Sequence, residues 1–171
     1  MDSKEDETAH DEFRALCTAV GFIVLNWGMA EQQLAILVNI ALRHCGGEGL
    51  LQGKDIPRQF IDKVEFLQAC FKKLPALEPF ASEGRSLVER VSARASKRND
   101  LVHGSLASFT PEKNGAFRFN KVGYEIDGHM VSTFTFSPRG FSRLETVLGD
   151  LLTEQTAFGQ KLADRFPEQP R

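Results

Sequence analysis

The chain has few cysteines, and their positions exclude several kinds of site. Cys17, Cys45 and Cys70 are widely separated. They match no zinc-binding spacing, and three cysteines leave an odd thiol in any disulfide scheme. A reducing, cytoplasmic location fits this pattern best. We therefore expect no metal site and no other cofactor.

The sequence also lacks an uncharged run long enough for a typical membrane span. Residues 15–30 carry no charge, but this run contains Asn26 and is followed by Glu31. A spanning helix needs roughly 18 to 20 apolar residues, so we expect no membrane partner. The N-terminal residues are acidic and polar, without the apolar segment of a signal peptide. We expect residues 1–10 to form a disordered tail.

Charge of one sign is not in excess either. The 21 lysines and arginines nearly balance the 23 acidic residues, and the formal net charge is −2. This balance argues against nucleic-acid binding over the whole surface, so any RNA contact has to be local. A local basic run exists, although a solvated helix face explains it equally well. It consists of Arg85, Arg90, Arg94, Lys97 and Arg98.

Apolar residues at helical spacing predict a mainly α-helical bundle with about four long helices. At 171 residues the chain is most simply one domain, residues 1–171. Proline, glycine and capping residues mark the helix ends, and residues 167–171 form a tail. The expected helices cover residues 11–45, 57–74, 82–104 and 138–166.

Residues 105–136 differ, because apolar and polar residues alternate there. This period predicts a small antiparallel β-meander before the last helix, with turns at Asn114-Gly115 and Asp127-Gly128. Phenylalanines on a sheet face can stack RNA bases, but more often they pack a sheet onto helices. The phenylalanines concerned are Phe109, Phe117, Phe119, Phe134 and Phe136.

The candidate site lies where the third predicted helix ends. Arg98 occupies a position on the apolar stripe where leucine would be expected. Asn99 and His103 are four residues apart, so the amide can orient the imidazole. Gly104 is expected to be the left-handed residue that stops the helix. An arginine and a histidine at one cleft suit metal-free phosphodiester cleavage, in which histidine moves a proton and arginine stabilises negative charge.

A simpler interpretation needs no catalysis. Arg98 can extend its stem along the core and reach water or a buried carboxylate. His103 can cap the helix C-terminus, where a positive charge is favoured. Both interpretations remain open from these residues alone.

The segment Arg98-Asn99-x-x-x-His103 resembles the signature of HEPN domains, in which an arginine precedes a histidine by a few residues. The resemblance implies a helical bundle that usually dimerises, and often a metal-independent endoribonuclease of a toxin-antitoxin or phage-defence system. It implies that His103 is the general base or acid, that Arg98 stabilises the phosphate and that Asn99 positions the imidazole. A cognate antitoxin or another protein partner is then expected. The alternative is a non-catalytic HEPN-like module that binds RNA, a nucleotide or a protein.

Glu31 and Asp100 are expected to support this site. Glu31 lies on the apolar stripe of the first helix, four residues after Trp27, and a buried carboxylate there needs a partner. The pattern Trp27-x-x-x-Glu31-x-x-Leu34 also resembles the opening helix of several HEPN-like proteins. We expect Glu31 to pair with Arg98 or to orient His103. A partly exposed glutamate at a helix turn is the alternative.

The number of histidines at the site predicts an oligomer. Cleavage by 2′-hydroxyl attack involves two proton transfers, which ideally use two groups in different protonation states. The motif offers one histidine, His103. A two-fold homodimer with both motifs at one cleft would supply the second.

Overall fold

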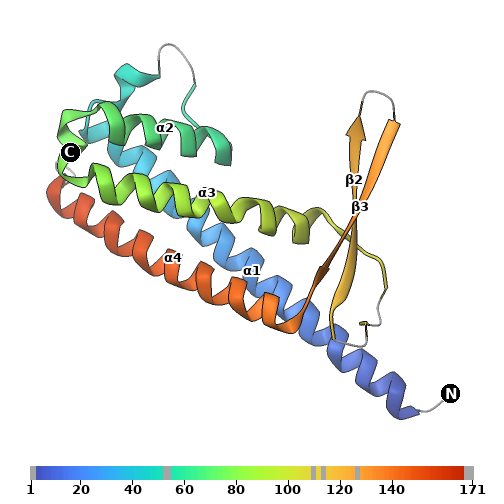
Figure 1. The fold of residues 1–171 in the computed structure, drawn as a ribbon. Helices are drawn as coiled ribbons and strands as arrows, with labels where there is room; N and C mark the ends of the chain where they lie inside the picture. Colours follow the sequence, from blue (N-terminus) through green and yellow to red (C-terminus); the bar gives the residue numbers. More distant parts are fainter. Residues whose placement is uncertain (1–2, 52–54, 109–110, 113–114, 126–127, 168–171) are drawn as a thin grey trace. The chain divides into compact units, whose positions relative to one another are not determined.

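The computed structural model describes residues 3–51, 55–108, 111–112, 115–125 and 128–167. These residues form four α-helices, two short 3-10 helices and a three-stranded antiparallel sheet that precedes the last α-helix (Figure 1). The predicted mainly α-helical fold with a β insert is therefore confirmed. The elements are α1 (Ser3–His44), η1 (Gly47–Leu50), α2 (Phe60–Lys73), η2 (Pro75–Phe80), α3 (Ala81–His103), β1 (Ser105–Leu106), β2 (Phe117–Glu125), β3 (Gly128–Phe136) and α4 (Pro138–Arg165).

The chain divides into two compact units, and neither is one continuous stretch. The first unit comprises residues 1–26 and 96–148, and the second comprises residues 27–95 and 149–171. The boundaries between them fall inside α1, α3 and α4 rather than in a linker. The expectation of a single domain stays a prediction.

The second unit is built from contacts between its helices. The ring of Trp27 on α1 lies 5.0 Å, centroid to centroid, from the ring of Phe60 on α2. On α3, a Cβ added to Gly84 would lie only 2.5 Å from the ring of Phe71, so α3 and α2 approach closely there. A residue without a side chain makes this packing possible.

Helix α4 completes the second unit through polar as well as apolar contacts. Arg90 on α3 donates a hydrogen bond to Glu154 on α4 at 3.0 Å. The amide of Gln155 is fully buried, and its Nε2 donates to the main-chain oxygen of Ala30 on α1 at 3.1 Å. Apolar side chains fill the space between these helices, among them Leu34, Leu37, Leu67, Val88, Val91, Phe158 and Leu162.

The sheet belongs to the first unit and packs its own aromatic rings together. Phe119 on β2 is opposite Phe134 on β3, and their rings stack with centroids 5.4 Å apart and planes 3° from parallel. Phe136 lies 5.1 Å from Phe141, which joins the end of β3 to the first turn of α4. These rings therefore pack against one another, and base stacking by them stays a prediction. Phe109 lies outside the described residues.

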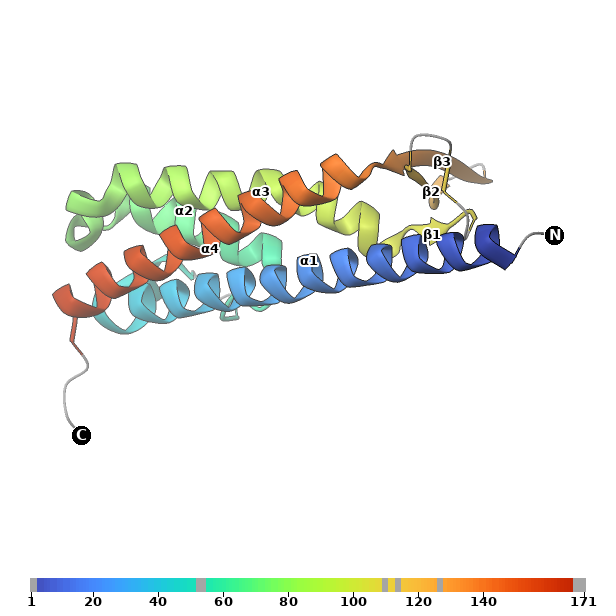
Figure 2. The ribbon, with the colours of Figure 1, turned by 90° about the horizontal axis from the view of Figure 1, so that it is seen from below.

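The short strand β1 pairs with β2, and Ser105 lies opposite Asn120 (Figure 2). Strand β1 consists of Ser105 and Leu106. Residues 107 and 108, which follow it, are not part of a strand.

Two expected helix starts are wrong. Helix α1 begins at Ser3, so residues 3–10 are helical rather than a disordered tail. The acidic N-terminal residues that suggested a tail are also favoured near a helix N-terminus, where the helix dipole is positive. Helix α2 begins at Phe60 rather than at Pro57, and the preceding Gln59 has extended backbone angles. The C-terminal tail expectation concerns residues of which 168–171 lie outside the described part.

Two other helix ends agree with the sequence. Ser137 caps α4, because its Oγ accepts a hydrogen bond from the main-chain N–H of Gly140 at 3.2 Å. Pro138 is the first residue of that helix, a position where its missing N–H costs nothing. After α1, Gly46 has a φ of 79°, the left-handed conformation that commonly stops a helix.

Helix α1 contains a long apolar stretch. By length and composition alone, the stretch His10–His44 could cross a membrane. One such helix is weak evidence, because the core helix of a soluble protein passes the same test. Ile23, Trp27 and Leu34 on this helix are buried, whereas only 22% of the apolar window is buried, and Phe22 and Leu25 are exposed. The expected cytoplasmic location and lack of a membrane partner stay predictions.

Candidate functional site

The candidate site lies in the first unit, at the C-terminal end of α3. His103 is the last residue of the helix, and the main-chain N–H of Gly104 donates to the oxygen of Asp100 at 2.9 Å. Gly104 does not have the left-handed conformation that the sequence suggested, since the positive-φ glycines among the described residues are Gly46 and Gly115. Helix α3 therefore ends without a left-handed glycine.

Close packing explains the glycine instead. A Cβ added to Gly104 would lie 2.5 Å from the main-chain oxygen of Asp100 and 2.7 Å from Cζ of Phe134. Both distances are shorter than van der Waals contact allows. Gly104 thus lets β3 approach the end of α3.

Arg98 is oriented by the residue that follows it. Its Nη1 donates a hydrogen bond to Oδ1 of Asn99 at 2.9 Å, and both residues are half-buried. We expected Asn99 to hold the imidazole of His103, but its hydrogen bond goes to the guanidinium. A bond from a charged donor is stronger than one between neutral groups. His103 itself is exposed.

Asp100 has a partner that sequence reasoning missed. The Nζ of Lys121 on β2 lies 2.9 Å from Oδ1 of Asp100, so an ion pair joins the end of α3 to the sheet. The sequence does indicate on which face of β2 Lys121 lies, because apolar and polar residues alternate there. Lys121 follows Phe117 and Phe119 at every second residue and therefore lies on the same face of the strand. Those two phenylalanines are buried.

Glu31 belongs to the second unit and has a partner there. Its carboxylate accepts a hydrogen bond from Nζ of Lys63 on α2 at 3.0 Å, and both side chains are half-buried. A carboxylate at this position needs a cation, as expected, and Lys63 supplies one. The expected pairing of Glu31 with Arg98 or His103 stays a prediction.

Two of the three thiols are buried in the fold. All three cysteines are free; Cys45 and Cys70 are buried, while Cys17 is exposed. Burial raises the pKa of Cys70 to about 12, and the neighbouring Cys45 adds to this rise. A thiol that holds its proton so firmly is a poor nucleophile. Within the part of the chain that the structure describes, no group of three or more His, Cys, Asp or Glu side chains could hold a metal ion.

Three side chains therefore lie at or near the end of α3. The guanidinium of Arg98 is hydrogen-bonded to Asn99, the imidazole of His103 is exposed, and Lys121 is paired with Asp100. A guanidinium can bind the oxygens of a phosphate or a carboxylate through two of its N–H groups. No family model, no curated protein and no solved structure matches this chain.

Proposed function

We propose that this protein is a HEPN-like, metal-independent endoribonuclease that acts through the end of α3. The observation that carries the proposal is the hydrogen bond by which Asn99 orients the guanidinium of Arg98. An arginine held in one orientation binds a phosphate with less loss of side-chain freedom. The exposed His103 on the following turn is open to a substrate.

The reaction uses no metal and no water. The 2′-oxygen of one ribose attacks the adjacent phosphorus, and the bond from phosphorus to the 5′-oxygen of the next nucleotide breaks. The products are a 2′,3′-cyclic phosphate and a 5′-hydroxyl. His103 takes the proton from the 2′-hydroxyl or gives one to the leaving oxygen, and Arg98 stabilises the negative charge on the non-bridging phosphate oxygens. Asp100 is a supporting residue, since it holds Lys121 beside the end of α3.

A homodimer is part of this proposal, because the second proton transfer needs a second group. The N-terminal part of α1 offers a surface for it. Phe22 and Leu25 are three residues apart on this helix, and 60% and 70% of their surfaces are exposed. Large exposed apolar side chains on one helix face commonly mark a contact with another protein. We assign this surface to a second copy of the chain.

A second candidate function is a non-catalytic module that binds RNA, a nucleotide or a protein such as an antitoxin. The Asp100–Lys121 ion pair favours it, because the carboxylate offsets one of the positive charges at the end of α3. A role in a toxin-antitoxin or phage-defence system fits either candidate.

The deciding experiment compares the parent protein with His103→Ala on end-labelled RNA in the presence of a chelator. We expect the parent to leave cyclic phosphates and the variant to lose roughly 10²-fold or more of the rate. His10→Ala is the matched control, because His10 is another exposed histidine, on α1. Binding of RNA with equal background cleavage by all three proteins would instead support the non-catalytic module.

A further inference from the structure

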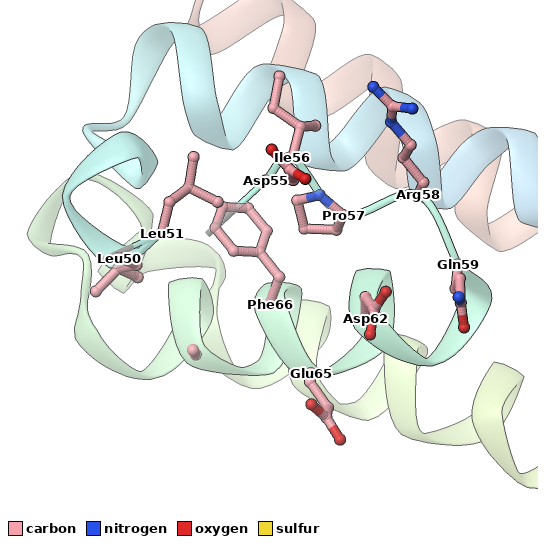
Figure 3. A pocket seen from close by; sticks show the side chains of 11 residues that line it. Leu50, Leu51, Asp55, Ile56, Pro57, Arg58, Gln59, Asp62, Glu65 and Phe66 are labelled. Atoms are coloured by element: carbon pink, nitrogen blue, oxygen red, sulfur yellow. The ribbon is translucent and has the colours of Figure 1, made fainter. Parts of the chain in front are cut away.

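A groove in the second unit has no part in the site at the end of α3. A hollow of about 480 Å³ lies between the segment 55–59 and α2 (Figure 3). A second hollow of about 630 Å³ is lined by Ala35, Val38 and Leu42 of α1. Both volumes are in the range of ligand pockets. We call them the α2 hollow and the α1 hollow.

The two hollows adjoin. Leu51, Ile56 and Pro57 line both of them. Ile56 is a large apolar residue with 58% of its surface exposed, and it lies in a segment that is neither helix nor strand. The two hollows lie on either side of Ile56 and Pro57, and we name them together the Ile56 groove.

One face of α2 forms a wall of the α2 hollow. Asp62, Glu65, Phe66 and Ala69 line this hollow and are spaced three, four and seven residues from the first of them, so they share a helix face. The ring of Phe66 reaches from α2 toward Leu51 and the segment opposite (Figure 3). The wall therefore contributes two acidic residues and one aromatic residue to the lining of the hollow.

The charge of the α2 hollow is negative. Three carboxylates, of Asp55, Asp62 and Glu65, and a single guanidinium, that of Arg58, line this hollow. Figure 3 shows the Arg58 side chain directed away from α2, so it does not offset the carboxylates of that helix. Within the described residues, none of the three carboxylates forms an ion pair.

The α1 hollow differs in character. Its walls from α1 are mainly apolar, and its two charged residues, Arg43 and Glu48, are of opposite sign. A ligand that fills the whole groove therefore needs a positive charge at one end and an apolar group at the other. Nucleic acid does not meet this requirement, because phosphates would be repelled by the carboxylates of α2.

We propose that the Ile56 groove binds an extended segment of a partner protein. The segment places a lysine or arginine against Asp62 and Glu65 and an apolar side chain in the α1 hollow, with Ile56 between them. Charge complementarity selects the basic residue, and burial of the apolar side chain supplies affinity. This site does not depend on the proposed ribonuclease activity.

Two synthetic peptides test the proposal with the full chain. One alternates leucine with lysine, and the other carries glutamate in place of every lysine. We expect the lysine peptide to bind with a dissociation constant at least about tenfold lower, measured by fluorescence anisotropy. Equal affinities would overturn the proposal.

Variants then locate the binding. Asp62→Asn with Glu65→Gln keeps the shape of the α2 wall, and we expect it to weaken lysine-peptide binding about tenfold. Glu89→Asn is the control, because Glu89 is an exposed acid on α3 outside the groove. Circular dichroism checks that each variant is folded, and RNA cleavage should be unchanged in all of them. Equal loss in the control variant, or no loss in the groove variant, would overturn the assignment. So would a groove variant that changes the mass of the free chain in light scattering, since the occupant would then be a second copy.

Discussion

Asn99 accepts a hydrogen bond from the guanidinium of Arg98, the residue directly before it on α3. Neighbouring residues on a helix point in different directions, so this bond fixes the arginine without placing the amide between arginine and substrate. In the proposed reaction Asn99 would act as a positioning residue, and its removal should affect the guanidinium rather than the helix.

We expect Asn99→Ala to lower the rate of RNA cleavage about tenfold, because the guanidinium of Arg98 loses the hydrogen bond that orients it. The melting temperature should fall by no more than a few degrees. Single-turnover cleavage and thermal unfolding measure the two effects. Asn39→Ala is the control, since Asn39 is exposed on α1. A variant with the parent's rate would show that Arg98 needs no such support.

The ion pair between Asp100 and Lys121 should contribute little to stability. Their side chains are 23% and 40% exposed, so water screens the attraction. We expect a coupling free energy of about 0.5 kcal/mol from a double-mutant cycle of Asp100→Ala and Lys121→Ala in urea. Raising the salt concentration should reduce the coupling further. A coupling free energy several times larger would mean that water screens the ion pair less than the exposure of its side chains suggests.

Gly104→Ala should destabilise the protein by roughly 1 to 3 kcal/mol, because the new methyl group would overlap the oxygen of Asp100 and the ring of Phe134. The matched control is Gly149→Ala in α4, where an added Cβ meets nothing within 4 Å. That change should stabilise the helix by about 0.5 to 1 kcal/mol. Chemical denaturation of both variants gives the comparison. Equal effects at the two positions would contradict the packing role of Gly104.

Alkaline pH should destabilise the fold through Cys70. Its pKa rises from an ordinary 9.0 to about 12 in the folded chain because the thiol is buried. Above pH 9 the unfolded chain therefore loses a proton that the folded chain keeps, and stability falls between pH 9 and pH 12. Melting temperatures across this window measure the fall.

Thiol labelling gives an independent check of this burial. With iodoacetamide and mass spectrometry, Cys17 should react in the native protein, because it is exposed. Cys70 should react only after unfolding. Early labelling of Cys70 would contradict its burial.

Periodicity made most of the fold predictable, since apolar spacing alone located four helices and the β insert between α3 and α4. The details that escaped depend on contacts between distant residues. Sequence spacing cannot show that Gly104 makes room for Phe134, or that Asn99 prefers Arg98 to His103. The position of Lys121 could have been predicted, because the alternation along β2 places it on the same face as two buried phenylalanines.

The buried amide of Gln155 gives the second unit a means of alignment. Among the described residues that are buried, Gln155 is the one with a polar side chain. Its Nε2 donates a hydrogen bond to the main-chain oxygen of Ala30. Leucines and valines would tolerate a slide of one helical turn, because one apolar contact replaces another. The amide would not, since an unpaired buried donor costs about 1 to 3 kcal/mol. A single glutamine thus fixes the position of α4 along the axis of α1.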